Sequence, residues 1–375
     1  MKKYLWMMLL IVFMGSLSFR TVIMAEETKG IKIDDKNFPD EHLRKAVYNW
    51  ADRDGDYVLQ PSEIERAKAI GISGLYENED DDYFSEVNLK GIEILKNLED
   101  VYIATEQLKN KKNRIINFNI LYQFKNLKRI EIHGDNATKR YDFSHFPKLR
   151  ELRLSYVKDF KSIKIANKKL SKLEIKSVKA KSFQIKSNNK VEFLEIDGLE
   201  TKKLDLSKMN KLSSLELYRT KINFLKFGKL KKLKRVNLQL HKKNGIRRLD
   251  LSGVKNLEDF SAWDLTKVKE IKFGALTSLK KIGIRAGEKK CNKALKKINL
   301  SEMKGLKVLI IKRMSKLNKI KICKNQKFKY FITENCKKLK QLDMKNCRVS
   351  KAFCIDKWTK VTNLNPIAKK HLKYN

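Results

Sequence analysis

Several residue types are scarce in this chain, and each scarcity excludes a class of structure. The 375 residues include only 4 Pro and 15 Gly, too few for a collagen-like or low-complexity chain. The 5 cysteines all follow residue 290, at Cys291, Cys323, Cys336, Cys347 and Cys354, and they form no C-x-x-C pair. The 5 histidines are scattered along the chain. Neither a disulfide framework nor a zinc site is therefore expected.

Motifs for catalysis are also missing. The sequence has no G-x-S-x-G, no H-E-x-x-H and no glycine-rich loop that could cradle a phosphate. We therefore expect a protein that binds rather than an enzyme.

Acidic residues are scarce in most of the chain. Residues 26–100 hold 10 bases and 20 acids, whereas residues 101–375 hold 72 bases and 23 acids, within a net charge of +42. Self-repulsion of this size destabilises a compact state, so such a protein usually meets an anionic partner. A lysine-rich genome is the alternative explanation, because 69 of the bases are Lys and only 16 are Arg.

The N-terminal segment is typical of an export signal. Lys2 and Lys3 precede an uncharged run of 16 residues, 4–19, which is shorter than the roughly 20 residues of a spanning helix. We expect residues 1–25 to be cleaved ahead of Glu26. The mature protein would then be secreted or held at the cell surface, with no membrane span.

An internal repeat of about eleven residues runs through most of the chain. Apolar residues fall at positions 1, 4, 6 and 9 of each unit, for example at Leu212, Leu215, Leu217 and in the next units of the form L-x-x-L-x-L. Positions 4 and 6 share one side of a strand but not of a helix. Each unit is then a short strand plus a turn, and two units make one coil of about 22 residues. Stacked coils would place a parallel sheet on each side of a flattened solenoid.

This pattern, with the LDLS segments at 204–207 and 249–252, resembles bacterial leucine-rich repeat proteins over residues 67–355. The resemblance implies a mainly β repeat solenoid preceded by a small helical cap at 26–66, and residues 356–375 would form a basic tail. It says almost nothing about the ligand, because such solenoids bind very different partners. The core is expected to include Val178, Leu215, Leu249, Ile282 and Leu309.

The cap carries a candidate calcium loop. Residues 52–63 resemble the loop of an EF-hand between two helices, and they place oxygen ligands at the spacing that a calcium ion needs. The expected ligands are the side chains of Asp52, Asp54, Asp56 and Glu63, the carbonyl of Val58, and a water held by Gln60.

One residue departs from that loop. Tyr57 stands where the turn needs a left-handed residue, usually Gly, and a bulky residue there costs roughly 1 kcal/mol or more. Either calcium binds as a structural ion, or the loop keeps its shape without the ion.

The outward face of one sheet is expected to be chemically diverse. Tyr218 and Trp263 lie there beside Arg285, and these residue types often anchor protein partners. The alternative is that these aromatic rings only pack on neighbouring strands.

Lysines gather in the turns. Lys231 and Lys232 occupy one turn, and Lys242 and Lys243 occupy the next. Stacked turns would form basic stripes that attract anionic polysaccharides or wall polymers, and nucleic acid only non-specifically. The alternative is a set of solvated lysines on a soluble scaffold.

The sequence therefore predicts an exported binding protein of the adhesin or surface-interaction type, recognising a protein or an anionic polymer through its repeat surface. Two alternatives stay open. One is a polysaccharide hydrolase that uses acids on the sheet face, where Glu174, Glu195 and Glu216 form a row. The other is a structural wall or spacer protein.

Overall fold

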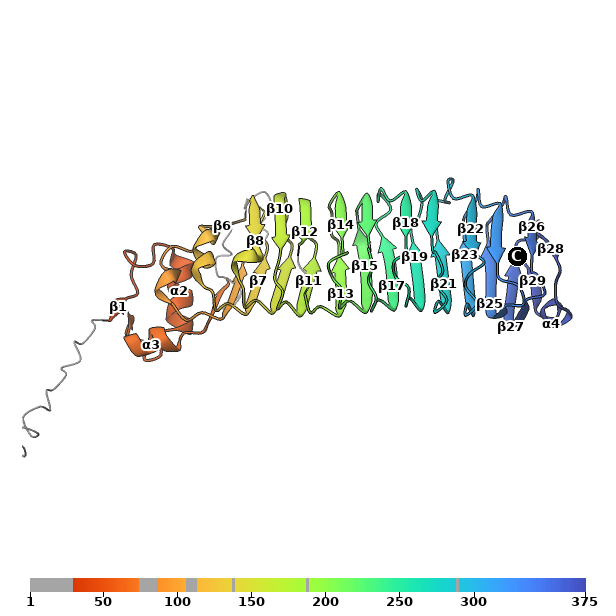
Figure 1. The fold of residues 1–375 in the computed structure, drawn as a ribbon. Coiled ribbons are helices and arrows are strands. Elements are labelled where there is room, and N and C mark those ends of the chain that lie inside the picture. Colours follow the sequence, from red (N-terminus) through yellow and green to blue (C-terminus); the bar gives the residue numbers. More distant parts are fainter. Residues whose placement is uncertain (1–29, 74–85, 106–112, 137–138, 187–188, 288–289) are drawn as a thin grey trace, which may run out of the picture.

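The computed structural model describes residues 30–73, 86–105, 113–136, 139–186, 189–287 and 290–375. The chain winds into an elongated solenoid whose strands run across the long axis (Figure 1). Within the described residues, no helix is long and apolar enough to cross a membrane. The expected signal segment lies outside the described residues.

Within the described residues, one side of the solenoid is a continuous parallel sheet of 14 strands, to which every second strand from β3 on belongs. Its strands are β3 (Ala69–Ser73), β5 (Asp100–Ala104), β7 (Arg129–His133), β9 (Glu151–Ser155), β11 (Lys172–Lys176), β13 (Phe193–Asp197), β15 (Ser214–Thr220), β17 (Arg235–Leu240), β19 (Asp259–Trp263), β21 (Lys281–Arg285), β23 (Val308–Lys312), β25 (Lys327–Glu334), β27 (Arg348–Ile355) and β29 (Leu372–Tyr374). We call it the main sheet.

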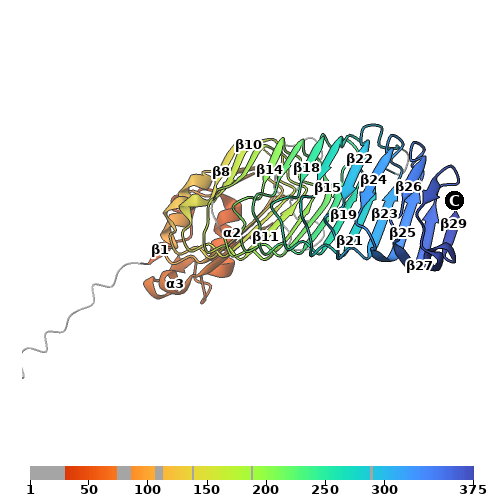
Figure 2. The same cartoon turned by 45° about the vertical axis from the view of Figure 1, so that its right-hand side comes forward.

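The opposite side consists of shorter strands in separate small groups, so the second sheet is interrupted where a continuous one was expected. The strands are β4 (Glu86–Asn88), β6 (Arg114–Ile116), β8 (Arg140–Asp142), β10 (Phe160–Ile165), β12 (Ala180–Ile185), β14 (Lys203–Asp205), β16 (Phe224–Lys226), β18 (Arg248–Asp250), β20 (Glu270–Lys272), β22 (Lys297–Leu300), β24 (Lys319–Ile322), β26 (Gln341–Asp343) and β28 (Lys360–Thr362). Short 3-10 helices η2 (Ile92–Ile94), η3 (Phe118–Gln123) and η4 (Phe143–His145) stand among the first coils. Figure 2 shows the two layers side by side.

The apolar repeat positions fill the space between the two layers. Leu215 pairs in register with Val236 on the next strand, and Ile282 pairs with Leu309. All five core residues expected from the repeat have no exposed surface: Val178, Leu215, Leu249, Ile282 and Leu309. The predicted solenoid and its inward register are confirmed, because inward side chains stack on their equivalents one coil away.

A helix–loop–helix unit precedes the first coil. It comprises α2 (Glu41–Trp50), the two-residue strands β1 (Ile31–Lys32) and β2 (Val58–Leu59), and α3 (Pro61–Arg66). The Asp40 side chain accepts the amide of Leu43, 3.0 Å away, and so caps α2. Its other oxygen accepts the amide of Asn88, 2.8 Å away, which ties the cap to β4 of the first coil. The indole of Trp50 lies so close to Gly71 that a Cβ there would be 2.9 Å from it, so α2 covers β3.

The repeat does not stop at residue 355, and the expected separate tail at 356–375 is wrong. β28 pairs with β26, and β29 pairs with β27 as the last strand of the main sheet. The short helix α4 (Pro366–Lys369) connects these two strands. Aliphatic residues such as Leu372 let this segment continue the coil despite its basic composition.

The register of the main sheet also shifts within β27. Phe328 pairs with Val349, but Tyr330 pairs with Ala352, so β27 holds one extra residue. As a result Ile355 is fully buried, whereas an eleven-residue repeat without the extra residue would place it on the outward face. Period-two alternation makes this outcome unavoidable, because one inserted residue exchanges the two faces of a strand.

Two cysteines occupy the ninth repeat position and point inward. Cys336 and Cys347 are both buried, and all five cysteines are free thiols. Burial raises the pKa of Cys336 to about 12 and that of Cys347 to about 11. Both side chains therefore act as small apolar core residues.

Candidate binding surface

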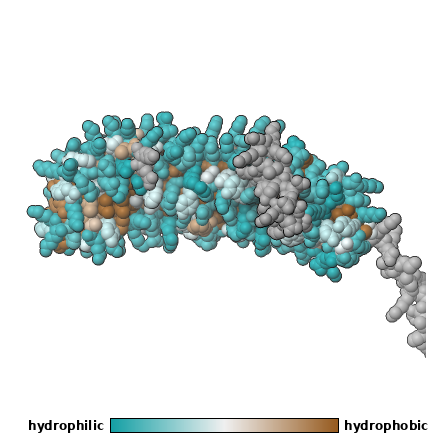
Figure 3. All heavy atoms as spheres, turned by 180° about the vertical axis from the view of Figure 1, so that it is seen from behind, coloured by the Kyte–Doolittle hydropathy of each residue, from teal (hydrophilic) through white to brown (hydrophobic). Residues whose placement is uncertain are grey.

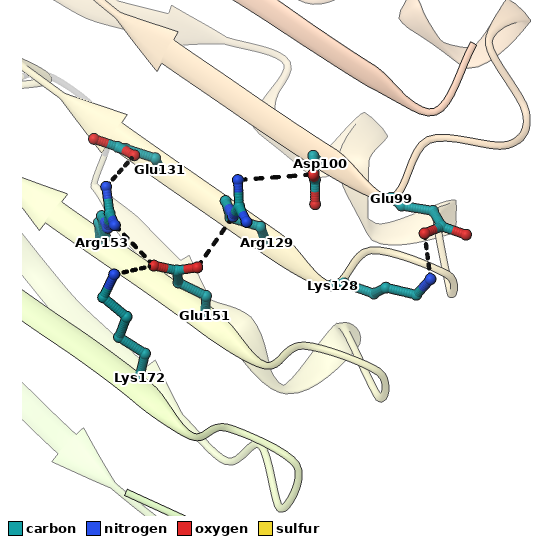
Figure 4. A network of polar contacts seen from close by, with 8 residues as sticks. All are labelled: Glu99, Asp100, Lys128, Arg129, Glu131, Glu151, Arg153 and Lys172. Atoms are coloured by element: carbon teal, nitrogen blue, oxygen red, sulfur yellow. Dashed lines mark hydrogen bonds and ion pairs between the residues drawn. The ribbon is translucent and has the colours of Figure 1, made fainter. Parts of the chain in front are cut away.

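The outward face of the main sheet is charged in its first half. Glu151 on β9 contacts three cations. Its oxygens lie 3.1 Å from Nε of Arg129 on β7, 2.9 Å from Nη2 of Arg153 on β9 and 2.6 Å from Nζ of Lys172 on β11. Arg153 also reaches Glu131, 3.2 Å away, on the preceding strand. Figure 4 shows how these side chains form a network across adjacent strands.

The network holds the pKa of Glu151 below its ordinary value. Partial burial alone would raise that pKa, but the hydrogen bond from Lys172 and the charges of Arg153 and Arg129 outweigh it. Glu151 is therefore an ionised carboxylate shared by three cations, and the charges in this part of the face are paired with one another.

The expected glutamate row lies on the next strands. Glu174, Glu195 and Glu216 pair in register across β11, β13 and β15. Glu174 has Arg153 Nε 3.5 Å away, and Glu216 accepts a hydrogen bond from the Tyr218 hydroxyl. That bond raises the pKa of Tyr218 to about 12, so the phenol stays a donor to its neighbour.

Toward the C-terminal end, the same face carries a group of apolar side chains on β23, β25 and β27. Val308 and Ile310 on β23, Tyr330 and Ile332 on β25, and Ala352 and Cys354 on β27 all occupy outward positions and are partly buried. We call these six residues the apolar patch. Figure 3 shows apolar surface toward the C-terminal end of the solenoid, bordered by hydrophilic side chains.

The repeat pattern does not predict the apolar patch. The L-x-x-L-x-L pattern marks inward residues, and outward positions 3 and 5 lie between them. The signal was the segment VLIIK at 308–312, where apolar residues stand on both sides of the strand. A strand that is apolar on both faces is typical of a strand covered on both faces.

Cations surround the apolar patch. Lys281 pairs in register with Val308, and the ammonium of Lys329 lies 5.7 Å from the centre of the Tyr330 ring. Nζ of Lys312 lies 2.6 Å from Oε2 of Glu334, and this hydrogen bond lowers the pKa of Glu334. Residues 306–375 carry 20 Lys and Arg against 3 Asp and Glu, so the setting of the patch is strongly positive.

Four of the residues expected to bind lie around one pocket. Trp263, Arg285, Lys242 and Lys243 line a cavity of about 630 Å³ at the carboxyl end of β17, β19 and β21. We call it the edge pocket. Tyr218 shares the outward row of Trp263, separated from it by Gln239, and does not reach the pocket.

The other two expected lysines are elsewhere. Lys231 and Lys232 are exposed in the turn before β17, and Lys242 and Lys243 are exposed in the turn after it. A strand of six residues spans roughly 20 Å, so the two pairs stand on opposite edges of the solenoid. They belong to two separate basic edges.

The loop between α2 and α3 gathers carboxylates. Oxygens of Asp52, Asp54 and Glu63 all lie within 4.8 Å of one another. Tyr57 adopts φ of 63°, the left-handed conformation that the loop requires at this position. The backbone thus takes the expected shape, and stacking on Tyr48, with ring centres 4.5 Å apart, supports the strained residue.

Hydrogen bonds inside this loop keep its oxygens close. Glu63 is buried and accepts the amides of Arg53, at 2.6 Å, and Gln60, at 2.9 Å. Asp52 accepts the amides of Gly55 and Tyr57, at 2.8 and 2.9 Å.

The remaining expected ligands frame the same loop. Asp56 accepts the amide of Val58 at 2.7 Å, and Val58 pairs with Lys32 on β1. A backbone hydrogen bond from Asp56 lowers the pKa of Asp54, yet desolvation and the nearby carboxylates raise it overall. Such crowding of acids is what a divalent cation relieves, so the side chains fit a calcium ion.

No protein-family model matches the chain, and no curated protein matches it. Among solved structures, the functional domain of InlJ from Listeria monocytogenes is 15% identical with a TM-score of 0.41, covering 86% of this chain and 78% of that one. The leucine-rich repeat domain of APL1B is 11% identical with a TM-score of 0.49, covering 83% and 86%. A leucine-rich repeat protein from Bacteroides ovatus is 16% identical with a TM-score of 0.26, covering 82% and 83%.

Proposed function

We propose that this chain is an exported, non-enzymatic binding protein that recognises a partner protein through the outward face of the main sheet. The observation that carries the proposal is the apolar patch. Val308, Ile310 and Ile332 turn aliphatic side chains toward solvent although the same strands already contribute a full inward row. Contiguous exposed apolar surface with a polar rim is typical of interaction sites.

The chemistry of the rim indicates the kind of partner. A partner that covers Ile310 and Ile332 brings its own apolar side chains, and the surrounding Lys281 and Lys329 favour carboxylates next to them. Association of opposite charges also accelerates encounter. We therefore propose a protein with an apolar centre and an acidic border.

The double variant Ile310→Ser with Ile332→Ser tests this proposal. A purified partner, first captured with the wild-type chain and identified by mass spectrometry, should bind the variant at least about tenfold more weakly, as expected when two anchors are lost. Phe224→Ser, at a 48% exposed residue on the opposite side, is the matched control and should leave the affinity unchanged. Equal affinity of wild type and double variant would refute the proposal.

A second candidate function rests on the two basic edges. Exposed Lys231 and Lys232 on one edge, with Lys242 and Lys243 on the other, support attraction of anionic polysaccharides or wall polymers. Lysines act as point charges, so this attraction would be broad in specificity and sensitive to salt. The glutamate row does not favour hydrolysis, because Arg153 and Tyr218 already engage two of its members.

For the cap we propose a structural calcium ion. The convergence of Asp52, Asp54 and Glu63 and the left-handed Tyr57 support it. Asp56, the Val58 carbonyl and a water on Gln60 would complete the oxygen ligands. Bound calcium would neutralise crowded carboxylates and stabilise the loop between α2 and α3.

A further inference from the structure

The edge pocket combines features that neither the apolar patch nor the basic edges have alone. The pocket lies at the carboxyl ends of three adjacent strands, where Gln239 pairs with Trp263 and Ala262 pairs with Ile284. Its volume of about 630 Å³ falls within the range of small-molecule sites. We propose that it binds one anionic sugar unit of a charged glycan, a specific site that rests on the polymer attraction proposed above.

Apolar and aromatic groups form the inner part of the pocket. Leu240 and Ala286 line it as buried residues, with 3% and 1% of their surface exposed. Trp263 is 45% exposed, and the Arg285 guanidinium carbon lies 5.9 Å from the centre of its ring. This stacking orients both side chains and leaves part of the indole open for the C–H groups of a sugar ring.

Cations form the outer part of the pocket. Lys242, Lys243 and Lys290 are exposed lining residues, and Arg285 adds a planar guanidinium. Arg219 also lines the pocket, but its Nε donates to Asp197 at 2.7 Å, so its charge is largely offset. Several cations around an apolar wall favour a ligand with both an apolar face and carboxylate or sulfate groups.

The turn that carries the two lysines is held in place by hydrogen bonds to its backbone. The side-chain amide of the buried Asn244 donates to the carbonyl of His241 at 2.8 Å and to that of Asp264 at 3.0 Å. The Lys243 amide donates to His241 Nδ1 at 3.1 Å. A preorganised turn lowers the entropy lost on binding, so this edge can bind a short ligand where a mobile turn could not.

A sugar suits the pocket better than a nucleotide base. The only aromatic ring among the described lining residues, apart from His241, is that of Trp263, and Arg285 already covers part of it. Full base stacking needs an open aromatic face, whereas a sugar ring needs only a few C–H contacts. The edge pocket therefore favours an anionic glycan over single-stranded nucleic acid.

The experiment measures binding of a heparin-derived tetrasaccharide by calorimetry to three variants of the full chain. Lys242→Ser with Lys243→Ser removes two cations at the pocket, and Trp263→Ala removes the aromatic wall. Lys231→Ser with Lys232→Ser is the matched control, since it removes the same charge at the other edge. Unchanged thermal unfolding would verify that each variant is folded.

The tetrasaccharide should bind at least about tenfold more weakly to the first two variants and within about twofold of wild type to the control. Binding of long heparin should weaken by a similar factor in either lysine double variant, because its affinity depends on the overall charge of the protein. The proposed pocket site would be overturned if the two lysine double variants weakened tetrasaccharide binding equally, or if Trp263→Ala did not weaken it. Either result would leave the proposed polymer attraction intact. Tighter binding of a tetranucleotide than of the tetrasaccharide would also overturn it.

Discussion

Glu151 and Arg153 lie two residues apart on the outward side of β9, and Arg153 Nη2 is 2.9 Å from Glu151 Oε1. The same carboxylate is shared with cations on β7 and β11. One acid thus connects three neighbouring coils, and its ionisation should contribute to the stability of the solenoid.

Acid should remove that contribution. The pKa of Glu151 is lowered in the folded state from the ordinary 4.5, so its stabilisation is complete above pH 4.5 and is lost as pH falls through the lowered value. Glu151→Gln should reduce the free energy of unfolding at pH 7 by roughly 1 kcal/mol or less, given partial exposure. The melting temperatures of the wild type and Glu151→Gln should differ at pH 7, and this difference should be smaller at pH 3. Glu302→Gln, at an exposed turn, is the control and should show no such difference.

A charge placed in the core should unfold several coils. Leu249 has no exposed surface and pairs in register with Ile271. Leu249→Asp would bury an unpaired carboxylate, which costs about 4 kcal/mol or more. Chemical denaturation should show this loss, whereas Lys255→Asp in the following exposed turn should change stability by less than about 0.5 kcal/mol. If Leu249→Asp unfolded at the same temperature as the wild type, the inward position of Leu249 would be contradicted.

Calcium should raise the melting temperature of the wild-type chain. An ion that binds only the folded cap stabilises it by mass action. Asp52→Ala with Asp54→Ala should abolish the calcium dependence, and it should also lower the melting temperature in chelator because the Asp52 hydrogen bonds to the amides of Gly55 and Tyr57 are lost. Calorimetric scans with calcium and with chelator make the comparison. Identical scans of the wild type in both conditions would refute the calcium site without affecting the fold.

Thiol labelling should divide the five cysteines into two groups. Cys336 and Cys347, with pKa raised to about 12 and about 11, are protonated and buried at pH 8, so they should resist a thiol reagent in the native state. Cys291, Cys323 and Cys354 are partly exposed and should react. Denaturant should release the two protected thiols. A disulfide between Cys336 and Cys347 would contradict the inward, reduced assignment.

Binding to long polyanions should weaken steeply with salt. Many lysine contacts release counterions together, so the logarithm of affinity should fall linearly with the logarithm of salt concentration. Charge reversal at Lys231, Lys232, Lys242 and Lys243 should flatten this slope. Titrations with heparin and teichoic acid at several salt concentrations measure it. If the protein does not bind these polymers at low salt, genome composition would explain the lysine excess instead.

The inward half of this fold follows from the repeat alone. Leu215 and Leu217 are both buried because a spacing of two residues selects one side of a strand. The extra residue in β27 was not foreseeable, since Ala352 and Cys354 are apolar enough to stand on either side. Only their pairing with Tyr330 and Ile332 decides which side they take.

Surface sites depend on turns, and the sequence pattern places turns poorly. Trp263 and Lys243 are 20 positions apart, and they line one pocket because two consecutive coils end at the same edge. The chain reverses after Trp263 through Asp264, whose φ is 61°. A left-handed aspartate has no distinctive sequence signal, so the pocket appears only in the structure.

The stacking of coils one strand apart has a mechanical consequence. Hydrogen bonds between β21 and β23, like those of every adjacent pair in the main sheet, point along the long axis of the solenoid (Figure 1). A force that separates the two ends would load one interface at a time, opening it like a zipper rather than shearing all strands together. Extension should therefore proceed coil by coil at low force, each step releasing about 22 residues of contour length, which at roughly 3.4 Å per residue is about 75 Å.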